Sequence, residues 1–301
     1  MKFMNRTIWI TALLTLGCLS AEPAGNGKHI VLIAGDQEYR SQESMPALAQ
    51  ILSTRHGFRC TVLYSTNRQT GKIDPATTDN IPGLEALRTA DLMILFARYL
   101  ELPDDQMKQI VDYTNSGRPI IGLRTSTHAF NYQKHLDSPY ANYSSRNKDG
   151  GYGRQVLGEN WVDHYGAHQK ESTRGVIVPA MQTHPILKGV HDIWGESDVY
   201  EITTLSGDSQ PLVMGQVLLG MDPSSLPDPA KKLMPIAWIK TYKTARVFMT
   251  TMGHAMDFKN EGFRRLMVNA CYWAMGMEAK ISPRSSVDIV GEYNPHPIGM
   301  K

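Results

Sequence analysis

Three polar side chains follow apolar runs in the sequence and are of types that can transfer protons or bind an oxygen. Asp36 and Glu38 come directly after the run 29–35, and Arg124 comes directly after the run 118–123. Carboxylates can act as general bases and bind sugar hydroxyls, and an arginine can stabilise a carbonyl oxygen or an oxyanion. The two acids could equally complement the N-terminus of a following helix, so both interpretations stay open.

Three histidines are further candidates for proton transfer. His254 ends the last clear strand pattern, where α/β enzymes often keep a general acid or base. His164 and His168 are four residues apart, a spacing that on a helix would place both rings on one face as metal ligands. The Tyr-Gly-Ala between them favours a loop, and the pattern identifies no third ligand. We therefore expect no cofactor, with a divalent metal at this pair as the alternative.

The turn after the run 118–123 lacks the features of a nucleophile elbow. In hydrolases of this type the elbow presents a Ser or Cys flanked by small residues. Here Arg124 and Thr125 occupy the turn, so Ser126 is a poor candidate for a nucleophile. Cys60 and Cys271 lie in apolar surroundings away from any His, and we expect two buried free thiols.

The elements that must position these side chains alternate along the first half of the chain. Apolar runs at 29–35, 59–64, 91–97 and 118–123 predict strands, and helices are expected from Ser41 to Gly57 and from Asp104 to Gly117. This order predicts an α/β fold with a three-layer, doubly wound, mostly parallel sheet. Ligands of such sheets bind beyond the carboxyl ends of the strands, which adds further candidates for substrate binding: Arg98, Thr125 and His128.

The second half of the chain has a different pattern. Periodicity disappears over 131–173, which we interpret as an irregular insertion rather than a linker because it is rich in aromatic residues. The strands expected after it cover 175–178, 198–202, 211–215, 235–239 and 246–251. An apolar stripe from Phe263 to Met277 predicts a final helix, ended near Gly276.

The first 21 residues read as a secretory signal peptide, followed by a single domain over 22–301. Lys2 and Arg6 precede an apolar stretch too short to span a bilayer, and small residues lead to Ala21. We therefore expect an exported protein, periplasmic or extracellular. The alternative is a lipoprotein anchored through Cys18.

Charge and length narrow the function classes. The chain has 301 residues with 31 Lys+Arg and 29 Asp+Glu. Lys2 and Arg6 account for the excess, so residues 22–301 hold 29 basic and 29 acidic residues. A neutral chain without a basic run is not expected to bind nucleic acid. A neutral chain suits a neutral small molecule such as a sugar as its substrate. No further apolar run predicts a transmembrane segment. A homo-oligomer is compatible with the sequence.

The order of several short motifs resembles the ThuA-like (trehalose-utilisation) family, whose fold is similar to the class I glutamine amidotransferase domain. The motifs are Ile30-Val31-Leu32-Ile33-Ala34-Gly35, Gly158-Glu159-Asn160-Trp161, His164, His184-Pro185-Ile186, Asp198-Val199-Tyr200, Gly253-His254, Phe263-Arg264-Arg265-Leu266 and Asn269-Ala270-Cys271-Tyr272-Trp273-Ala274. The Gly-Asp-Gln-Glu-Tyr-Arg and Gly-Leu-Arg-Thr-Ser-Thr-His-Ala-Phe stretches resemble a secreted branch in planctomycete-type and verrucomicrobial bacteria.

The resemblance matches individual residues of this chain to positions in the family's motifs. His254 matches the family's Gly-His, His164 matches its insertion histidine, and Asp198 matches its acid before Tyr. The family's elbow commonly reads Gly-Ile-His-Ser-Ala, so Arg124 and Thr125 stand where a His and a Ser are usual. Amidotransferases carry their Cys at this elbow, and because this chain has none there, glutamine hydrolysis is not expected.

What the resemblance implies is a carbohydrate-processing hydrolase, lyase or isomerase acting on a disaccharide or its 3-keto derivative. The candidate catalytic residues are His254, Arg124, His164 and Asp36. The candidate substrate-binding residues are Glu38, Arg98, Thr125, His128, Asp198 and Tyr200. Two alternatives remain, a non-catalytic sugar-binding module and a zinc-dependent hydrolase that uses His164 and His168.

Overall fold

Nine strands form one sheet in the computed structural model of the protein, which describes residues 24–299. The expected signal peptide over 1–21 and the alternative anchor at Cys18 lie outside the described residues. Among residues 24–299, no helix combines the length and the apolar character needed to cross a bilayer.

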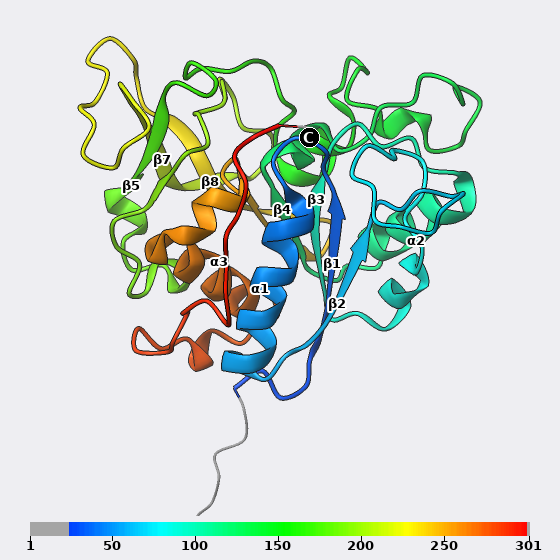
Figure 1. Ribbon diagram of the computed structural model, residues 1–301, viewed down its shortest axis with the longest axis horizontal. Helices are drawn as coiled ribbons and strands as arrows, with labels where there is room; N and C mark the ends of the chain where they lie inside the picture. The colour runs from blue at the N-terminus through cyan, green and yellow to red at the C-terminus, as the bar shows by residue number, and fades with distance from the viewer. Residues whose placement is uncertain (1–23, 300–301) are drawn as a thin grey trace, which may run out of the picture.

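Five neighbouring strands are parallel and include the four that the apolar runs predict. In sheet order they are β2 (Arg59–Tyr64), β1 (His29–Gly35), β3 (Leu92–Ala97), β4 (Ile120–Leu123) and β9 (Ala245–Thr250). Their carboxyl ends therefore meet at one edge of the sheet, and Figure 1 shows β1 and β2 pointing to the end of the molecule that is uppermost in the view.

The other half of the sheet is antiparallel, so the expected mostly parallel sheet is confirmed only in part. From β9 the order continues with β8 (Met234–Tyr242), β7 (Gln210–Leu218), β5 (Ser172–Ile177) and β6 (Trp194–Gly195). Every pairing from β9 to β6 is antiparallel. The physical reason is the connections: β8 and β9 are joined by a tight hairpin at Lys243, and a parallel pair would need a long crossover.

Both faces of the parallel half are covered by helices. The helices α1 (Ser41–His56) and α3 (Glu261–Ala274) lie to one side of β1, and α2 (Asp104–Asn115) lies to the other (Figure 1). Alternate residues of β1 show why its sequence is apolar throughout. Ile30 packs in the core on the α1 side and Val31 in the core on the α2 side, and both are fully buried.

The helix boundaries follow the sequence signals closely. Helix α1 begins at Ser41 and ends before Gly57, whose φ of 73° provides the left-handed C-cap that favours glycine. Helix α3 is capped by Asn260, whose side-chain oxygen accepts a hydrogen bond from the Phe263 amide at 2.8 Å. The predicted free cysteines are confirmed, although Cys60 is only half-buried, whereas Cys271 is buried.

The strand expected over 198–202 does not form, and that prediction is wrong. Its one ladder contact is an isolated bridge between Tyr200 and His164. The Asp198 carbonyl accepts from the Arg124 side chain, and the Val199 carbonyl accepts from the backbone amide of Tyr165. Because the Asp198 carbonyl is taken by a side chain rather than by a strand amide, the pairing does not extend beyond this bridge.

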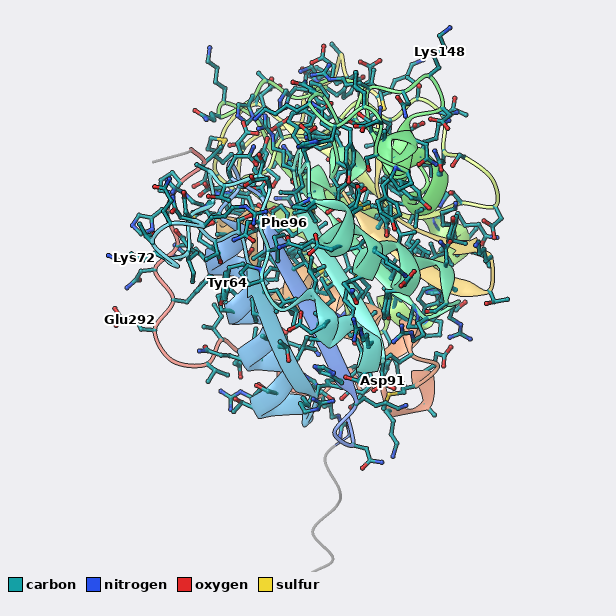
Figure 2. All side chains as sticks on the ribbon, turned by 90° about the vertical axis from the view of Figure 1, so that its right-hand side faces the viewer. Tyr64, Lys72, Asp91, Phe96, Lys148 and Glu292 are labelled. Carbon is teal, nitrogen blue, oxygen red and sulfur yellow. The ribbon has the colours of Figure 1, made fainter. Side chains whose placement is uncertain are left out.

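The segment 131–171 lies over the carboxyl ends of the parallel strands. Figure 2 shows Lys148, in this segment, at the opposite end of the molecule from Asp91, which precedes β3. The segment contains a single 3₁₀ turn (Ala141–Tyr143) and a π-helical turn (Gly153–Leu157). A Cβ on Gly153 would lie 1.8 Å from the Thr127 carbonyl oxygen, so only glycine allows this segment to pack against the turn after β4.

Candidate functional site

Arg124 is at the centre of a buried polar cluster beyond the carboxyl ends of the strands. It directly follows β4 with a left-handed φ of 44°, and its side chain is fully buried. Nη1 donates to the carbonyls of Asp198 at 2.6 Å and Thr251 at 2.8 Å. Nη2 donates to Tyr39 Oη at 3.0 Å and to Asp198 Oδ1 at 2.7 Å. The guanidinium therefore orients Asp198 rather than facing solvent.

Aromatic rings complete the surroundings of the Arg124 guanidinium. Its central carbon lies 3.7 Å from the ring centroid of Tyr200 and 4.4 Å from that of Tyr39. Cation–π contacts of this kind stabilise a cation that has lost its water. Tyr200, a predicted binding residue, is thus part of the buried support of the site.

The buried carboxylate of Asp198 holds two histidines. Oδ2 lies 2.6 Å from His164 Nδ1, and Oδ1 lies 3.0 Å from His168 Nδ1. Burial alone would raise the pKa of Asp198, but Arg124 and the two imidazoles together hold it well below its usual value. An ionised acceptor favours a proton on each Nδ1, which leaves the Nε2 atoms as acceptors. The Nε2 atom of His168 lies 3.4 Å from Nε2 of Gln169, which can donate to it.

The two histidines reach Asp198 from a loop, as their sequence context predicts. Their ring centroids are 4.5 Å apart, and the side chains of His164 and His168 are 28% and 26% exposed. The loop is fixed by the backbone amides of Tyr165 and Gly166, which both donate to the Val199 carbonyl. The loop that carries the paired imidazoles is therefore held in place, and both rings remain accessible from solvent.

A second ion pair lies beside the histidines. Arg98, after β3, contacts Glu38, after β1, with 2.9 Å between Nε and Oε2. The other Glu38 oxygen, Oε1, lies 3.7 Å from Nε2 of His168. Both residues follow the carboxyl ends of parallel strands, and the structure places them side by side at that edge of the sheet. Each of the two arginines, Arg98 and Arg124, is therefore paired with a carboxylate.

Asp36 lies below this pair in the turn between β1 and α1. Its Oδ1 accepts from the amides of Glu38 at 3.0 Å and of Tyr39, and its Oδ2 accepts from Thr125 Oγ1 at 2.7 Å. Burial raises the pKa of Asp36 to about 6, and the hydrogen bonds from Tyr39 and Thr125 offset only part of that rise. Asp36 and Thr125 therefore join the turns after β1 and β4.

The raised pKa of Asp36 predicts a pH-dependent stability. The folded protein holds this proton more tightly than the unfolded chain, in which the pKa of the carboxyl group is 3.8. The protonated group favours folding at low pH, and this contribution is lost as the pH rises from about 4 to about 6. Asp36→Asn removes the titration. We expect the unfolding free energy of the wild type, relative to this variant, to fall by about 2–3 kcal/mol between those pH values in urea titrations. A constant difference across the range would contradict this prediction.

His254 is fully buried behind Tyr39, with 6.1 Å between the ring centroids. Burial lowers the pKa of His254 to about 4. Neither ring nitrogen has a hydrogen-bond partner at normal geometry within residues 24–299, although the His296 backbone lies close by. The turn before it is fixed by Asp257, which accepts from the Gly253 amide at 2.8 Å. The structure thus places His254 near the cluster but away from solvent.

The C-terminal segment covers this histidine. It runs along α1 to the site end of the molecule (Figure 1), and Tyr293 Oη donates to the Ala255 carbonyl at 2.7 Å. Further along, the Gly299 amide donates to the Glu38 carbonyl at 3.0 Å. These contacts attach the segment next to His254 and at Glu38.

Removing this cover is expected to expose His254. In the full chain, modification of His254 by diethyl pyrocarbonate should be at least about tenfold slower than that of exposed His135, because reaction requires local opening. In a chain that ends at Gly291, the two rates should become similar. Peptide mass spectrometry measures both rates, and His135 serves as the internal control. Rapid modification of His254 in the full chain would refute the burial.

His128 belongs to an aromatic wall beside the cluster. It is 4% exposed, and its ring centroid lies 4.8 Å from Tyr99 and 5.3 Å from Trp161. Burial lowers the pKa of His128 well below its usual value, so this ring is neutral. Ser126 is also buried and donates to the Leu95 carbonyl at 2.7 Å, in keeping with the expectation that it is no nucleophile.

Sequence reasoning missed two residues of the site, Tyr39 and Trp161. Tyr39 contacts Arg124 and lies 3.4 Å from His168 Nδ1 through its hydroxyl, and its signal was its place in the same strand-end loop as Glu38. Trp161 packs edge-on against His164 with centroids 5.7 Å apart. Its signal was the Gly-Glu-Asn-Trp motif just before the histidine pair.

One surface hollow lies away from this cluster. It is lined by residues near the start of α2 and in the segment 131–171, among them Glu101, Asp104 and His135. We favour the polar cluster as the functional site, because its charged groups are buried, converge on one another and have shifted pKa values.

Comparisons with known proteins identify the family and the fold. The family model described as ThuA, trehalose utilisation, matches residues 30–274. A ThuA-like protein from Parabacteroides merdae is similar in structure, with a TM-score of 0.52 and 16% identity over 82% of this chain and 90% of that chain. A ThuA-like protein from Bacteroides uniformis gives a TM-score of 0.44 and 14% identity over the same shares. At these identities the likeness shows the fold alone. No curated protein matches the chain.

Proposed function

The chain belongs to the ThuA family of trehalose-utilisation proteins, and from this premise we propose that it is an exported enzyme that processes a disaccharide or the 3-keto derivative of one. The observation that supports this proposal most is the pair of accessible imidazoles, His164 and His168, on one buried, ionised Asp198. Imidazoles are the side chains best suited to transfer protons near neutral pH.

The charge and polarity of the site suit a neutral sugar. Arg98 and Arg124 are each paired with a carboxylate, so neither offers an unpaired positive charge that would attract an anionic substrate strongly. Sugar hydroxyls both donate and accept hydrogen bonds, and the accessible rim offers both kinds of partner. Glu38 and the imidazole Nε2 atoms accept, and Arg98 donates.

The pair of histidines supports acid–base chemistry without a covalent intermediate. A ketone at C3 of a glucoside makes the neighbouring C2–H acidic, so one neutral imidazole can take that proton. As the C2–H bond breaks, a C1–C2 double bond forms and the C1–O bond to the second sugar breaks. The second imidazole, in its protonated form, can give a proton to the leaving oxygen. Asp198 stabilises whichever ring is charged.

A substrate panel tests this proposal. The full chain would be incubated with trehalose, sucrose and their 3-keto derivatives, and products would be followed by NMR. We expect turnover of at least one of these compounds by the wild type. The matched control is a double variant, His164→Gln with His168→Gln, in which turnover should be lost. Absence of turnover for every compound would reject the proposal.

The second candidate is a sugar-binding module without catalysis. It is favoured by the turn after β4, where Thr125, Ser126 and Thr127 are all fully buried and hydrogen-bonded within the protein. The position that carries the nucleophile in related folds therefore offers no reactive group to solvent. Calorimetry that shows sugar binding with no product after long incubation would favour this candidate over the enzyme.

A further inference from the structure

The side chains of His164, His168 and Asp198 form a set that is typical of transition-metal sites. One ligand atom from each lies within 4.8 Å of the other two. Two imidazoles and one carboxylate are the protein ligands of many catalytic zinc sites and of non-haem iron(II) sites, which keep positions open for water or substrate. The acid–base scheme above uses these groups without any ion, and an ion on both Nδ1 atoms would leave no basic nitrogen on the rings, so the ion-bound and proton-transferring states of the pair exclude one another.

We propose that His164, His168 and Asp198 bind one divalent transition-metal ion, with zinc as the ion that best matches the ligand set. Ligand atoms around tetrahedral zinc lie about 3.3–3.5 Å apart, because the bonds are about 2.0–2.2 Å long. In the structure the Nδ1 atoms of His164 and His168 lie 2.6 and 3.0 Å from the Asp198 oxygens. Small rotations of these two partly exposed rings would open the space that an ion needs.

Glu38 lies beside the second ring nitrogen of His168, Nε2, where it can orient the ring for metal binding at Nδ1. Binding of an ion at Nδ1 places the ring proton on Nε2, and His168 Nε2 lies 3.7 Å from Glu38 Oε1. Arg98 holds Glu38 in place through its own ion pair at 2.9 Å. A carboxylate that accepts the remaining N–H of a metal-bound imidazole fixes the ring and increases its basicity. Glu38 is thus a positioning residue for the ion.

Arg124 also contacts Asp198, and it limits the affinity of the site for the metal ion. Its Nη2 donates to Oδ1 at 2.7 Å, which orients the carboxylate as hydrogen-bonded metal ligands commonly are. Its positive charge also repels a dication. We therefore expect a dissociation constant in the micromolar range, weaker than that of a structural zinc site. The inference concerns metal binding alone and does not depend on the substrate of the proposed enzyme.

Metal binding can be measured directly with the full chain and without substrate. The purified protein would be treated with a chelator, dialysed into chelator-free buffer, and titrated with Co²⁺ while its visible absorption is recorded. Zn²⁺ stoichiometry would be measured by equilibrium dialysis and elemental analysis. We expect one ion per chain, a Co²⁺ spectrum more intense than that of the hydrated ion, and displacement of Co²⁺ by Zn²⁺.

Variants separate this site from adventitious binding. His164→Gln and His168→Gln should each weaken binding at least about tenfold, and Glu38→Gln should weaken it by about tenfold. His135→Gln is the matched control, because His135 is exposed and outside the cluster, and its binding should be unchanged. Circular dichroism would confirm that each variant is folded. Failure to bind one ion, or equal affinity in both cluster histidine variants and the control, would overturn the proposal, whatever the outcome of the substrate panel.

Discussion

Replacing Arg124 with methionine is expected to lower the free energy of unfolding by about 3–5 kcal/mol. The guanidinium is fully buried and makes four hydrogen bonds, two of them to Asp198. Without it, the ionised carboxylate of Asp198 stays buried without its cation, and two carbonyls lose their donor. Urea titration monitored by circular dichroism measures the change.

The control for this prediction is Arg118→Met. Arg118 also hydrogen-bonds to carbonyls and stacks on a tyrosine, but it is partly exposed and pairs with no buried acid. Arg118→Met should therefore lower the free energy of unfolding clearly less than Arg124→Met does. A double-mutant cycle between Arg124→Met and Asp198→Asn should show a coupling energy of about 1–3 kcal/mol. A loss below about 1 kcal/mol for Arg124→Met would refute its role as the support of the site.

Replacing His164 or His168 with glutamine should reduce turnover of the substrate by about 10²–10⁴-fold, because one proton-transfer group is lost. The same variants should change the unfolding free energy by less than about 1 kcal/mol, since each side chain is only partly buried at the edge of the cluster. Steady-state kinetics and urea titration on the same preparations give both quantities.

The pH profile distinguishes a chemical role from a structural one. If one imidazole acts as the base and the other as the acid, the wild-type rate should have a bell-shaped pH dependence, and each single variant should lose one limb. His135→Gln, at an exposed histidine outside the cluster, should leave the profile unchanged. Unchanged turnover in both cluster variants would show that the pair has no catalytic role.

Much of the parallel half of the fold could be predicted from the sequence, for a clear physical reason. A strand buried on both faces must be apolar at every position, and β1 and β3 are continuous apolar runs. Helix α1 carries its own stop signal in Gly57. The antiparallel half was less predictable, because strand patterns do not say which neighbour each strand will join.

The segment 198–202 shows where local patterns fail. Its alternation of polar and apolar residues resembles a strand, yet the Asp198 and Val199 carbonyls accept from groups that are distant in sequence. A pattern that extends over five residues cannot reveal such partners. At Asp198 the buried side chain of Arg124 takes the place of a strand amide as the donor to the carbonyl.

The candidate site was predictable to a similar extent. The rule that ligands bind at the carboxyl ends of parallel strands placed Glu38, Arg98 and Arg124 in one region, and the structure brings them there. The sequence could not show that Asp198 would lie under His164 and His168, because two irregular loops meet only through tertiary contacts. For the same reason, the sealed position of His254 could not be foreseen.

A crystal structure of the full chain with a bound disaccharide, or with its 3-keto derivative, tests the central claim most directly. We predict sugar oxygens within hydrogen-bond distance of Nε2 of His164 or His168, with Glu38 or Arg98 contacting the same sugar, and the carboxylate of Asp198 still paired with Arg124. A sugar bound elsewhere, for example in the hollow beside Glu101 and His135, with no oxygen near either imidazole, would contradict the account.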